Sequence, residues 1–180
     1  MGDTQSRRLE EHIAREVLII GAMIGLALVQ VTLIPTPLGI TSALALVVVV
    51  SRVLVGIGAH NPAREVGTAI RWAFYCGIAL DLFTTTPAGS HALALLLATI
   101  LVMLAVGRFQ VGGALLPLIA VLLGTLVYEG VLALVYHLTV AQLDWRLHAQ
   151  VILLPSLLLT LVPTLPIFHL LRWYYRTIRA

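Results

Sequence analysis

Long apolar runs separated by short polar segments are the dominant pattern of this 180-residue chain. A helix needs about 20 mostly apolar residues to cross the hydrocarbon core of a bilayer. Six candidate runs cover 17–34, 38–58, 66–86, 91–107, 113–138 and 150–171. Leucine and valine recur in them without the strict alternation of a β-barrel strand. Because lipid cannot satisfy backbone polar groups, each run predicts a membrane-spanning helix.

The composition supports an integral membrane protein. Hydrophobic residues make up 60% of the chain and charged residues 11%, whereas soluble domains hold roughly 45–50% and 25%. All 11 cationic residues are scattered arginines, which argues against binding to nucleic acid. Cys76 is the single cysteine, which excludes a disulfide framework and a multi-cysteine metal site. We therefore expect an all-α integral membrane protein that uses no metal and no cofactor.

The arginines predict how the six runs are oriented. With six crossings, the arginines of the termini and of two connecting segments share one side, and only Arg146 lies on the other. By the positive-inside rule we expect both termini in the cytoplasm. The chain then divides into a cytoplasmic N-terminal segment (1–16), a six-helix transmembrane domain (17–171) and a cytoplasmic tail (172–180). The first segment is either a short helix capped by Thr4 or a frayed tail.

The segment from Gly77 to Ala92 combines a membrane-embedded acid with a tight turn. Asp81 lies near the end of an apolar run, and an acid inside a membrane span is by default functional or partner-facing. The turn that follows is marked by Thr84, Thr85, Thr86, Pro87 and Gly89. Thr86 can cap the next helix and Pro87 suits its first turn, while Gly89 permits close packing or an unusual dihedral angle. The hairpin therefore either fixes the crossing of two helices or binds a partner.

Three further charged residues lie within apolar runs: Arg52, Arg71 and Glu129. At about 1.5 Å per residue, both arginines are near enough to a helix end to snorkel to the interface. Asp81 and Glu129 lie in the outer half of the membrane, where short carboxylates snorkel less easily. His91 and His137 are their candidate internal partners. The alternatives are a protonated or backbone-bonded acid, and a polar patch that a partner helix or a ligand completes.

Gly21 and Gly25 form a G-x-x-x-G pair in the first run. Small residues four positions apart let two helices approach closely. Packing within the chain is the first interpretation of this pair, and a partner interface is the second.

No catalytic constellation stands out in the sequence. Neither H-E-x-x-H nor G-x-S-x-G occurs. Glu10, Glu11 and Arg15 match the E-E-x-x-x-R signature of a family of intramembrane proteases, but they precede the first apolar run among polar residues. The six histidines are scattered. We therefore expect that the chain is not an enzyme.

The Asp81 hairpin, the six runs and the length resemble the rod shape-determining protein MreD family. In that family an apolar helix ends in G-x-x-x-D, and a turn of small residues leads through Gly to the next helix. Here the matching residues are Gly77, Asp81, Pro87 and Gly89. A second similarity is Gln30, which closes the first run in QVTLIP.

The resemblance implies a non-enzymatic scaffold of the bacterial inner membrane that binds MreC, whose single transmembrane helix precedes a periplasmic domain. It also implies the elongation machinery around MreC, with RodA, a penicillin-binding transpeptidase and the MreB filament as further possible partners. Membrane lipid is an expected partner as well. The family is similar in fold to the substrate-binding subunits of energy-coupling-factor transporters, so a vitamin-binding subunit is the alternative. The partner-binding or structural residues that we expect are Asp81, Thr84, Pro87, Gly89, His91, Glu129, Gly21 and Gly25.

Overall fold

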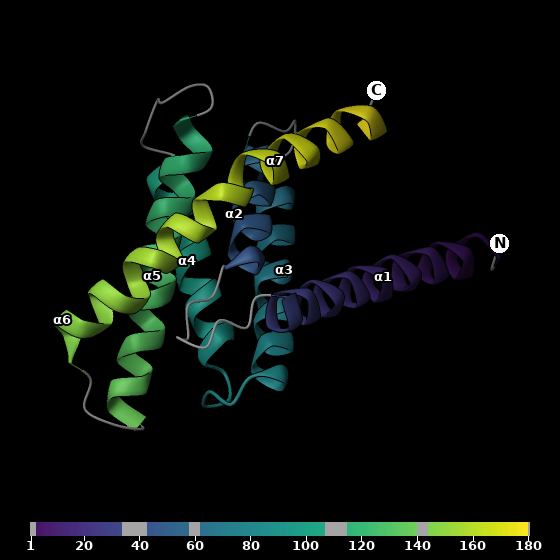
Figure 1. Cartoon of the computed structure of the whole chain (residues 1–180). Coiled ribbons are helices and arrows are strands. Elements are labelled where there is room, and N and C mark those ends of the chain that lie inside the picture. Colours follow the sequence, from purple (N-terminus) through teal and green to yellow (C-terminus); the bar gives the residue numbers. More distant parts are fainter. Residues whose placement is uncertain (1–2, 34–42, 58–61, 107–114, 140–143, 180) are drawn as a thin grey trace.

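The computed structural model of the chain describes residues 3–33, 43–57, 62–106, 115–139 and 144–179. Within these ranges every regular element is a helix, which confirms the all-α expectation (Figure 1). The elements are α1 (Asp3–Leu33), α2 (Leu44–Ile57), α3 (Pro62–Phe83), α4 (Ser90–Val106), α5 (Leu115–Thr139), α6 (Trp145–His148), the π-helical turn η1 (Ala149–Leu153) and α7 (Leu154–Arg179).

Four helical stretches are long and apolar enough to cross a membrane. They are Ile13–Thr32, Arg64–Phe83, Leu115–Thr139 and Trp145–Tyr175. Helices α2 and α4 are also apolar but have only 14 and 17 residues. At 1.5 Å per residue these two helices are about 21 and 26 Å long, which is less than the hydrocarbon thickness of about 30 Å. Their backbone ends therefore need partners from within the protein.

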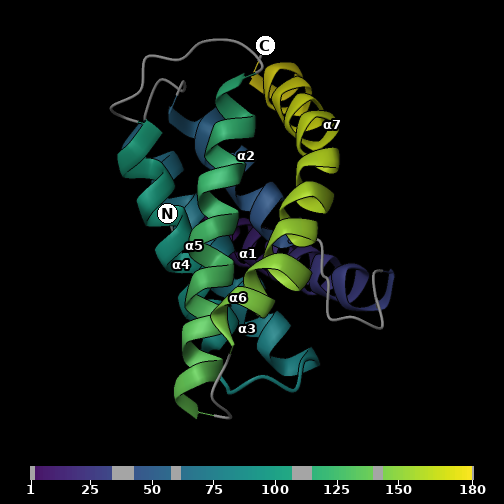
Figure 2. The same cartoon turned by 60° about the vertical axis from the view of Figure 1, so that its left-hand side comes forward.

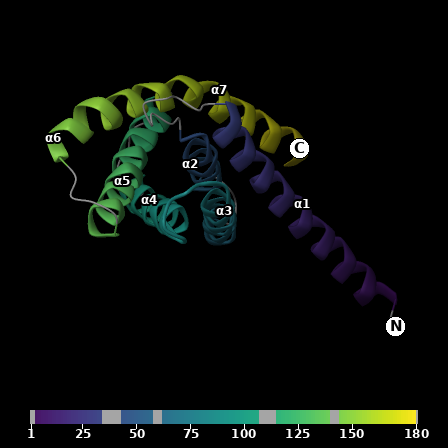
Figure 3. The same ribbon diagram turned by 60° about the horizontal axis from the view of Figure 1, so that its bottom comes forward.

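Helices α2 to α5 lie side by side and are seen nearly end-on in Figure 3, where α7 arches over one side of the group and α1 runs outward from it. Figure 2 shows α5 between α4 and α7, and both pairs are in contact. Helix α1 packs mainly on α3. Its N-terminal half projects beyond the other helices (Figures 1 and 3). The contacts that join α1 to α3 and α2 include those of Glu16, Met23 and Gln30.

Small side chains make up much of the core. Alanine and valine account for most of its fully buried apolar residues, among them Val47, Val50, Ala73, Ala94, Ala98, Val102 and Val121. In lipid, small residues let helix backbones approach closely and gain van der Waals contact. A Cβ placed on Gly124 of α5 would lie 3.3 Å from Val102 of α4 and 3.5 Å from Val50 of α2. These short distances show how closely α2, α4 and α5 pack at Gly124.

Both ends of the chain are more helical than the apolar runs indicate. Helix α1 begins at Asp3, so the segment before the first run continues the same helix, and Thr4 lies inside it instead of capping it. Helix α7 passes through Pro163 and Pro166 and reaches Arg179. Pro155 is the second residue of α7 and directly follows the π-helical turn η1, so the helical hydrogen-bond pattern is irregular where its N–H is missing.

Candidate functional site

Asp81 holds the start of α4 from the neighbouring helix. Its Oδ1 accepts the backbone N–H of His91 at 2.9 Å, and its Oδ2 accepts that of Ala92 at 3.2 Å. The first N–H groups of a helix have no partner within it, and the helix dipole favours a negative charge beside them. Asp81 thus acts as the N-terminal cap of α4 although it belongs to α3. Of the alternatives for Asp81, the structure therefore shows the backbone-bonded acid, because Asp81 accepts the backbone N–H of His91 while the imidazole of His91 bonds to Tyr128.

The turn between α3 and α4 is closed by hydrogen bonds of its own. Thr84 Oγ1 donates back to a carbonyl of α3 at 2.8 Å and lies 2.9 Å from Thr86 Oγ1. The expectation that Thr86 caps α4 is therefore wrong, because its hydroxyl is used within the turn. Ser90 N–H donates to the Pro87 carbonyl at 3.1 Å. Gly89 has φ +89°, which confirms the unusual dihedral angle expected there.

Gly77 brings the backbones of α3 and α4 into contact. A Cβ placed on it would lie 2.3 Å from Cα and 2.8 Å from the backbone nitrogen of Ala92. Gly77 and Asp81 are four residues apart, so both face the start of α4. The glycine permits the close approach, and the carboxylate then binds the exposed N–H groups. The G-x-x-x-D spacing is one structural unit that joins the two helices.

His91 and Tyr128 extend this unit to α5. His91 Nδ1 and the Tyr128 hydroxyl share a hydrogen bond of 2.7 Å, and both side chains are buried. The Nε2 atom of His91 has no hydrogen-bond partner among the described residues. Sequence reasoning missed Tyr128, although a tyrosine beside Glu129 in an otherwise apolar run was a usable signal.

Gln30 holds the start of α2 in the way that Asp81 holds the start of α4. Its Oε1 accepts the backbone N–H of Ala45 at 2.8 Å. The Oγ1 of Thr160 on α7 accepts the N–H of Ala43, just before α2, at 3.2 Å. Both short apolar helices therefore have N–H groups at their starts satisfied by side chains of longer neighbours. Gln30 and Asp81 are also the two polar residues on which the family resemblance rests.

Glu129 is a buried acid next to Tyr128, and only 5% of it is exposed. Its Oε1 has no hydrogen-bond partner among the residues that the structure describes. His137, the other candidate partner, has its ring 5.4 Å from that of Trp145 at the start of α6. The structure therefore joins Asp81, His91 and Tyr128, whereas His137 lies against α6.

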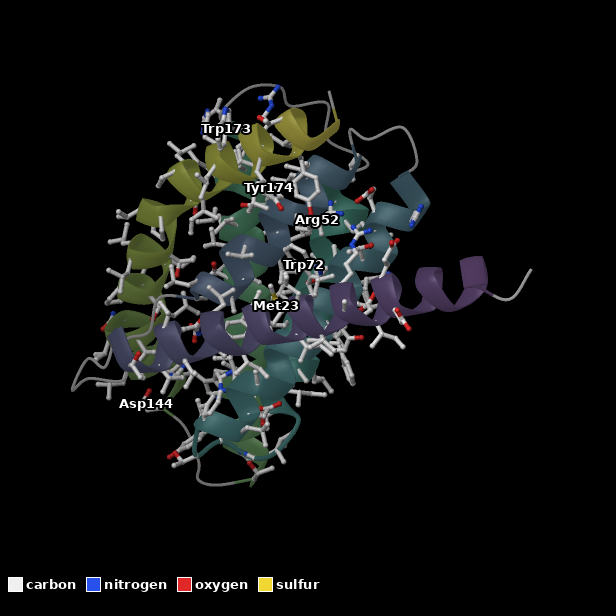
Figure 4. All side chains as sticks on the ribbon, turned by 90° about the vertical axis from the view of Figure 1, so that its right-hand side faces the viewer. Met23, Arg52, Trp72, Asp144, Trp173 and Tyr174 are labelled. Atoms are coloured by element: carbon white, nitrogen blue, oxygen red, sulfur yellow. The ribbon has the colours of Figure 1, made fainter. Side chains whose placement is uncertain are left out.

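Arg52 is buried instead of snorkelling to the interface, so that expectation is wrong. Only 3% of its side chain is exposed, and its guanidinium forms an ion pair with Glu65 of α3. The guanidinium lies 4.5 Å from the ring centre of Tyr175 on α7 and 5.7 Å from that of Trp72 on α3. Figure 4 shows Arg52 and Trp72 near each other. This cation connects α2, α3 and α7 at the end of the bundle opposite the Asp81 turn.

Arg71 forms a more exposed ion pair, at 2.8 Å, with Glu16 of α1. Almost half of its side chain is accessible, 48%, which fits the interfacial position expected for it. The interpretation of Gly21 and Gly25 as a packing site within the chain is wrong for the described residues. A Cβ on either glycine would meet no atom within 4 Å. The cause is that α1 turns a different face toward α3.

The described residues also line an apolar cavity of about 150 Å³ between α4 and α5. Its walls include Val102 and Ala105 of α4 and Leu116 and Ala120 of α5. These residues lie toward the end of α4 opposite His91, so the cavity is separate from the polar group around Asp81. Such a space suits a hydrocarbon chain more than a polar ligand.

The polar residues described so far join helices to one another. Asp81 and Gln30 accept backbone N–H groups at helix starts, and Arg52 and Arg71 form ion pairs with acids of neighbouring helices. Comparison with family models, with curated proteins and with solved structures finds no match to this chain. Its function has to be inferred from its own residues.

Proposed function

We propose that this chain is an MreD-like, non-enzymatic scaffold of the bacterial inner membrane that binds MreC and helps organise peptidoglycan synthesis in rod-shaped growth. One observation carries the proposal. The residues of the family resemblance, Gly77, Asp81 and Gln30, build the starts of the two short helices. Their placement at corresponding positions of two helices supports the proposal.

Six membrane crossings with both termini in the cytoplasm are part of the proposal. Two observations support them. The starts of α2 and α4 are capped by side chains, so these helices can begin inside the membrane without leaving N–H groups bare. Arg52 near the end of α2 meets Glu65 near the start of α3, which fits neighbouring helices of opposite direction. The proposed relation to the fold of energy-coupling-factor substrate-binding subunits rests on the same six crossings.

A scaffold has to present a fixed surface, and the charged residues of this chain support that role. Asp81, Arg52 and Arg71 each hold one helix against another. The bundle is thereby held together independently of any bound small molecule. In this proposal, the bundle positions MreC, and through it RodA, the transpeptidase and MreB.

A vitamin-binding subunit is the second candidate, and one observation favours it. The Nε2 atom of His91 and the Oε1 atom of Glu129 are buried, and neither has a hydrogen-bond partner among the described residues. A polar ligand could supply both partners. The carboxylate of Asp81, however, already accepts two backbone N–H groups, so it is not a free ligand group for a vitamin.

Depletion of the chain in its own bacterium distinguishes the two candidates. The scaffold proposal predicts that rods become round during depletion and that a plasmid copy restores them, whatever vitamins the medium contains. The rival predicts normal rods whose growth depends on an added vitamin. Normal shape and normal growth in minimal medium would contradict both.

A further inference from the structure

We infer that the apolar cavity between α4 and α5 binds one acyl chain of a membrane phospholipid, which enters between the two helices from the lipid-facing surface. The site is independent of the proposed partner, because it depends only on the cavity and on a length of α5 that can cross a membrane. It adds a ligand site to a chain whose described polar residues mainly join helices to one another.

The cavity lies beside the closest contact between α4 and α5. The two helices meet at Gly124, where an added Cβ would lie 3.3 Å from Val102. From this contact toward the end of α4, the cavity wall includes Ala105 of α4 and Ala120 of α5. The methyl groups of these alanines are too short to fill the space, which leaves about 150 Å³ between the helices.

The lining of the cavity excludes water and favours hydrocarbon. All seven described residues that line it are apolar, whereas a buried water needs about two to four polar partners. A dry apolar cavity of comparable volume can bind molecules of the size of benzene. If the space were empty, its walls would lose van der Waals contacts. A hydrocarbon chain restores these contacts and leaves no polar group unpaired.

The cavity extends from the interior of the protein to its lipid-facing surface. Val102 and Ala120 in its wall are 0% and 1% exposed, whereas Ile119 in the same wall is 39% exposed. Leu104 and Leu115, which are sequence neighbours of lining residues, are 63% and 62% exposed. In a bilayer, exposed apolar side chains of this kind meet acyl chains. The occupant therefore comes from the bilayer and enters beside Ile119.

The depth of the cavity matches one leaflet of the bilayer. Its α5 residues lie within the first nine residues of that helix, Leu115 to Leu123. At 1.5 Å per residue this stretch is about 13 Å long, which is roughly half of the hydrocarbon thickness. The cavity also lies at the C-terminal end of α4. In the proposed orientation this end faces the cytoplasm, so the bound chain belongs to a lipid of that leaflet.

Photo-labelling by a lipid tests the site in the full chain. The protein is reconstituted in vesicles of phosphatidylethanolamine and phosphatidylglycerol that contain a small share of phosphatidylcholine with a diazirine midway along one acyl chain. After irradiation, mass spectrometry locates the labelled residues. We expect label on Ala120, which lipid outside the protein does not reach because this residue is 1% exposed. Leu158 and Val162 of α7, at 69% and 75% exposed, report ordinary contact with the surrounding lipid.

Two substitutions of Ala105 change the cavity in opposite directions. Ala105→Leu fills the space and should lower the labelling of Ala120 at least about fivefold, while labelling of Leu158 stays unchanged. Ala105→Gly enlarges the space and should preserve the labelling of Ala120. Glycine weakens a helix more than leucine does. A loss of label caused by unfolding would therefore be larger in Ala105→Gly, which is the reverse of the expected order.

Two results would overturn the inference. One is label on Leu158 and Val162 of the wild-type chain without label on Val102 or Ala120. The other is equal labelling of Ala120 in the wild type and in Ala105→Leu, because a chain that binds in the cavity has to be displaced when the cavity is filled.

Discussion

The carboxylate of Asp81 meets the backbone N–H of His91 at 2.9 Å across the turn that joins α3 to α4. The acid that the sequence marks as costly in a membrane is thus the cap of a helix that starts inside the bundle. The same carboxylate reaches Ala92, whose backbone touches Gly77 one turn below. These two contacts with α3 fix the start of α4, an apolar helix of 17 residues.

Asp81→Asn should lower the stability of the protein in detergent by about 1–2 kcal/mol, because the amide keeps one acceptor oxygen and loses the charge and the second acceptor. Thermal unfolding followed by size-exclusion chromatography measures the effect. Asp144→Asn is the matched control, since Asp144 caps the exposed four-residue α6 by accepting the Arg146 N–H at 3.1 Å. Equal melting temperatures for wild type and Asp81→Asn would show that the cap contributes nothing.

Gly77→Ala should destabilise the protein by about 3 kcal/mol, because the new methyl group would overlap the backbone of Ala92 and force α3 and α4 apart. Gly67→Ala, on the same helix, serves as the control. A Cβ on Gly67 meets no atom within 4 Å, so that change should be neutral or stabilise the helix by up to about 1 kcal/mol. The account fails at this position if the two variants melt alike.

Gln30→Leu should loosen the start of α2 without loosening the start of α4, because each cap serves one helix. Hydrogen exchange measured by mass spectrometry should show faster exchange of the amide of Ala45 in this variant, whereas the amide of Ala43 keeps its acceptor on Thr160. Asp81→Asn should show the reverse, with faster exchange at His91 and Ala92. Uniform acceleration across all helices in both variants would mean that the two residues act on global stability only.

Arg52→Met should cost about 3–5 kcal/mol, because it removes the cation of a buried ion pair with Glu65. Arg71→Met removes the exposed ion pair with Glu16 and should cost less than about 1 kcal/mol. The double variant Arg52→Met with Glu65→Gln should recover part of the loss, because it also removes the buried negative charge that Arg52 balances. Detergent unfolding curves of the three variants and the wild type compare these costs. A larger loss for Arg71→Met than for Arg52→Met would contradict the burial that distinguishes them.

Composition and apolar runs were enough to predict an all-helical membrane protein. The rest of the fold depended on contacts between distant residues, which no local pattern encodes. Arg52 illustrates this, because an arginine near a helix end predicts snorkelling unless the acid of another helix is known to lie beside it. Gly21 and Gly25 illustrate it again, since a G-x-x-x-G pair shows close packing without showing which helix packs there.

The candidate site was predictable where residues that contact each other are also close in the sequence. Gly77 and Asp81 lie one helical turn apart, and the start of α4 follows them after a short turn. Asp81 and His91 could therefore be connected from the sequence. Tyr128 lies 37 residues beyond His91, and Thr160 lies 117 residues beyond Ala43, so neither contact could be inferred from spacing.

Co-purification of this chain with MreC from the same genome, in mild detergent, tests the central claim most directly. The account predicts a stable complex that survives size-exclusion chromatography and is lost when the transmembrane helix of MreC is exchanged for an unrelated one. A chain that is folded and monodisperse but recovers no MreC, and that recovers transporter subunits instead, would contradict it.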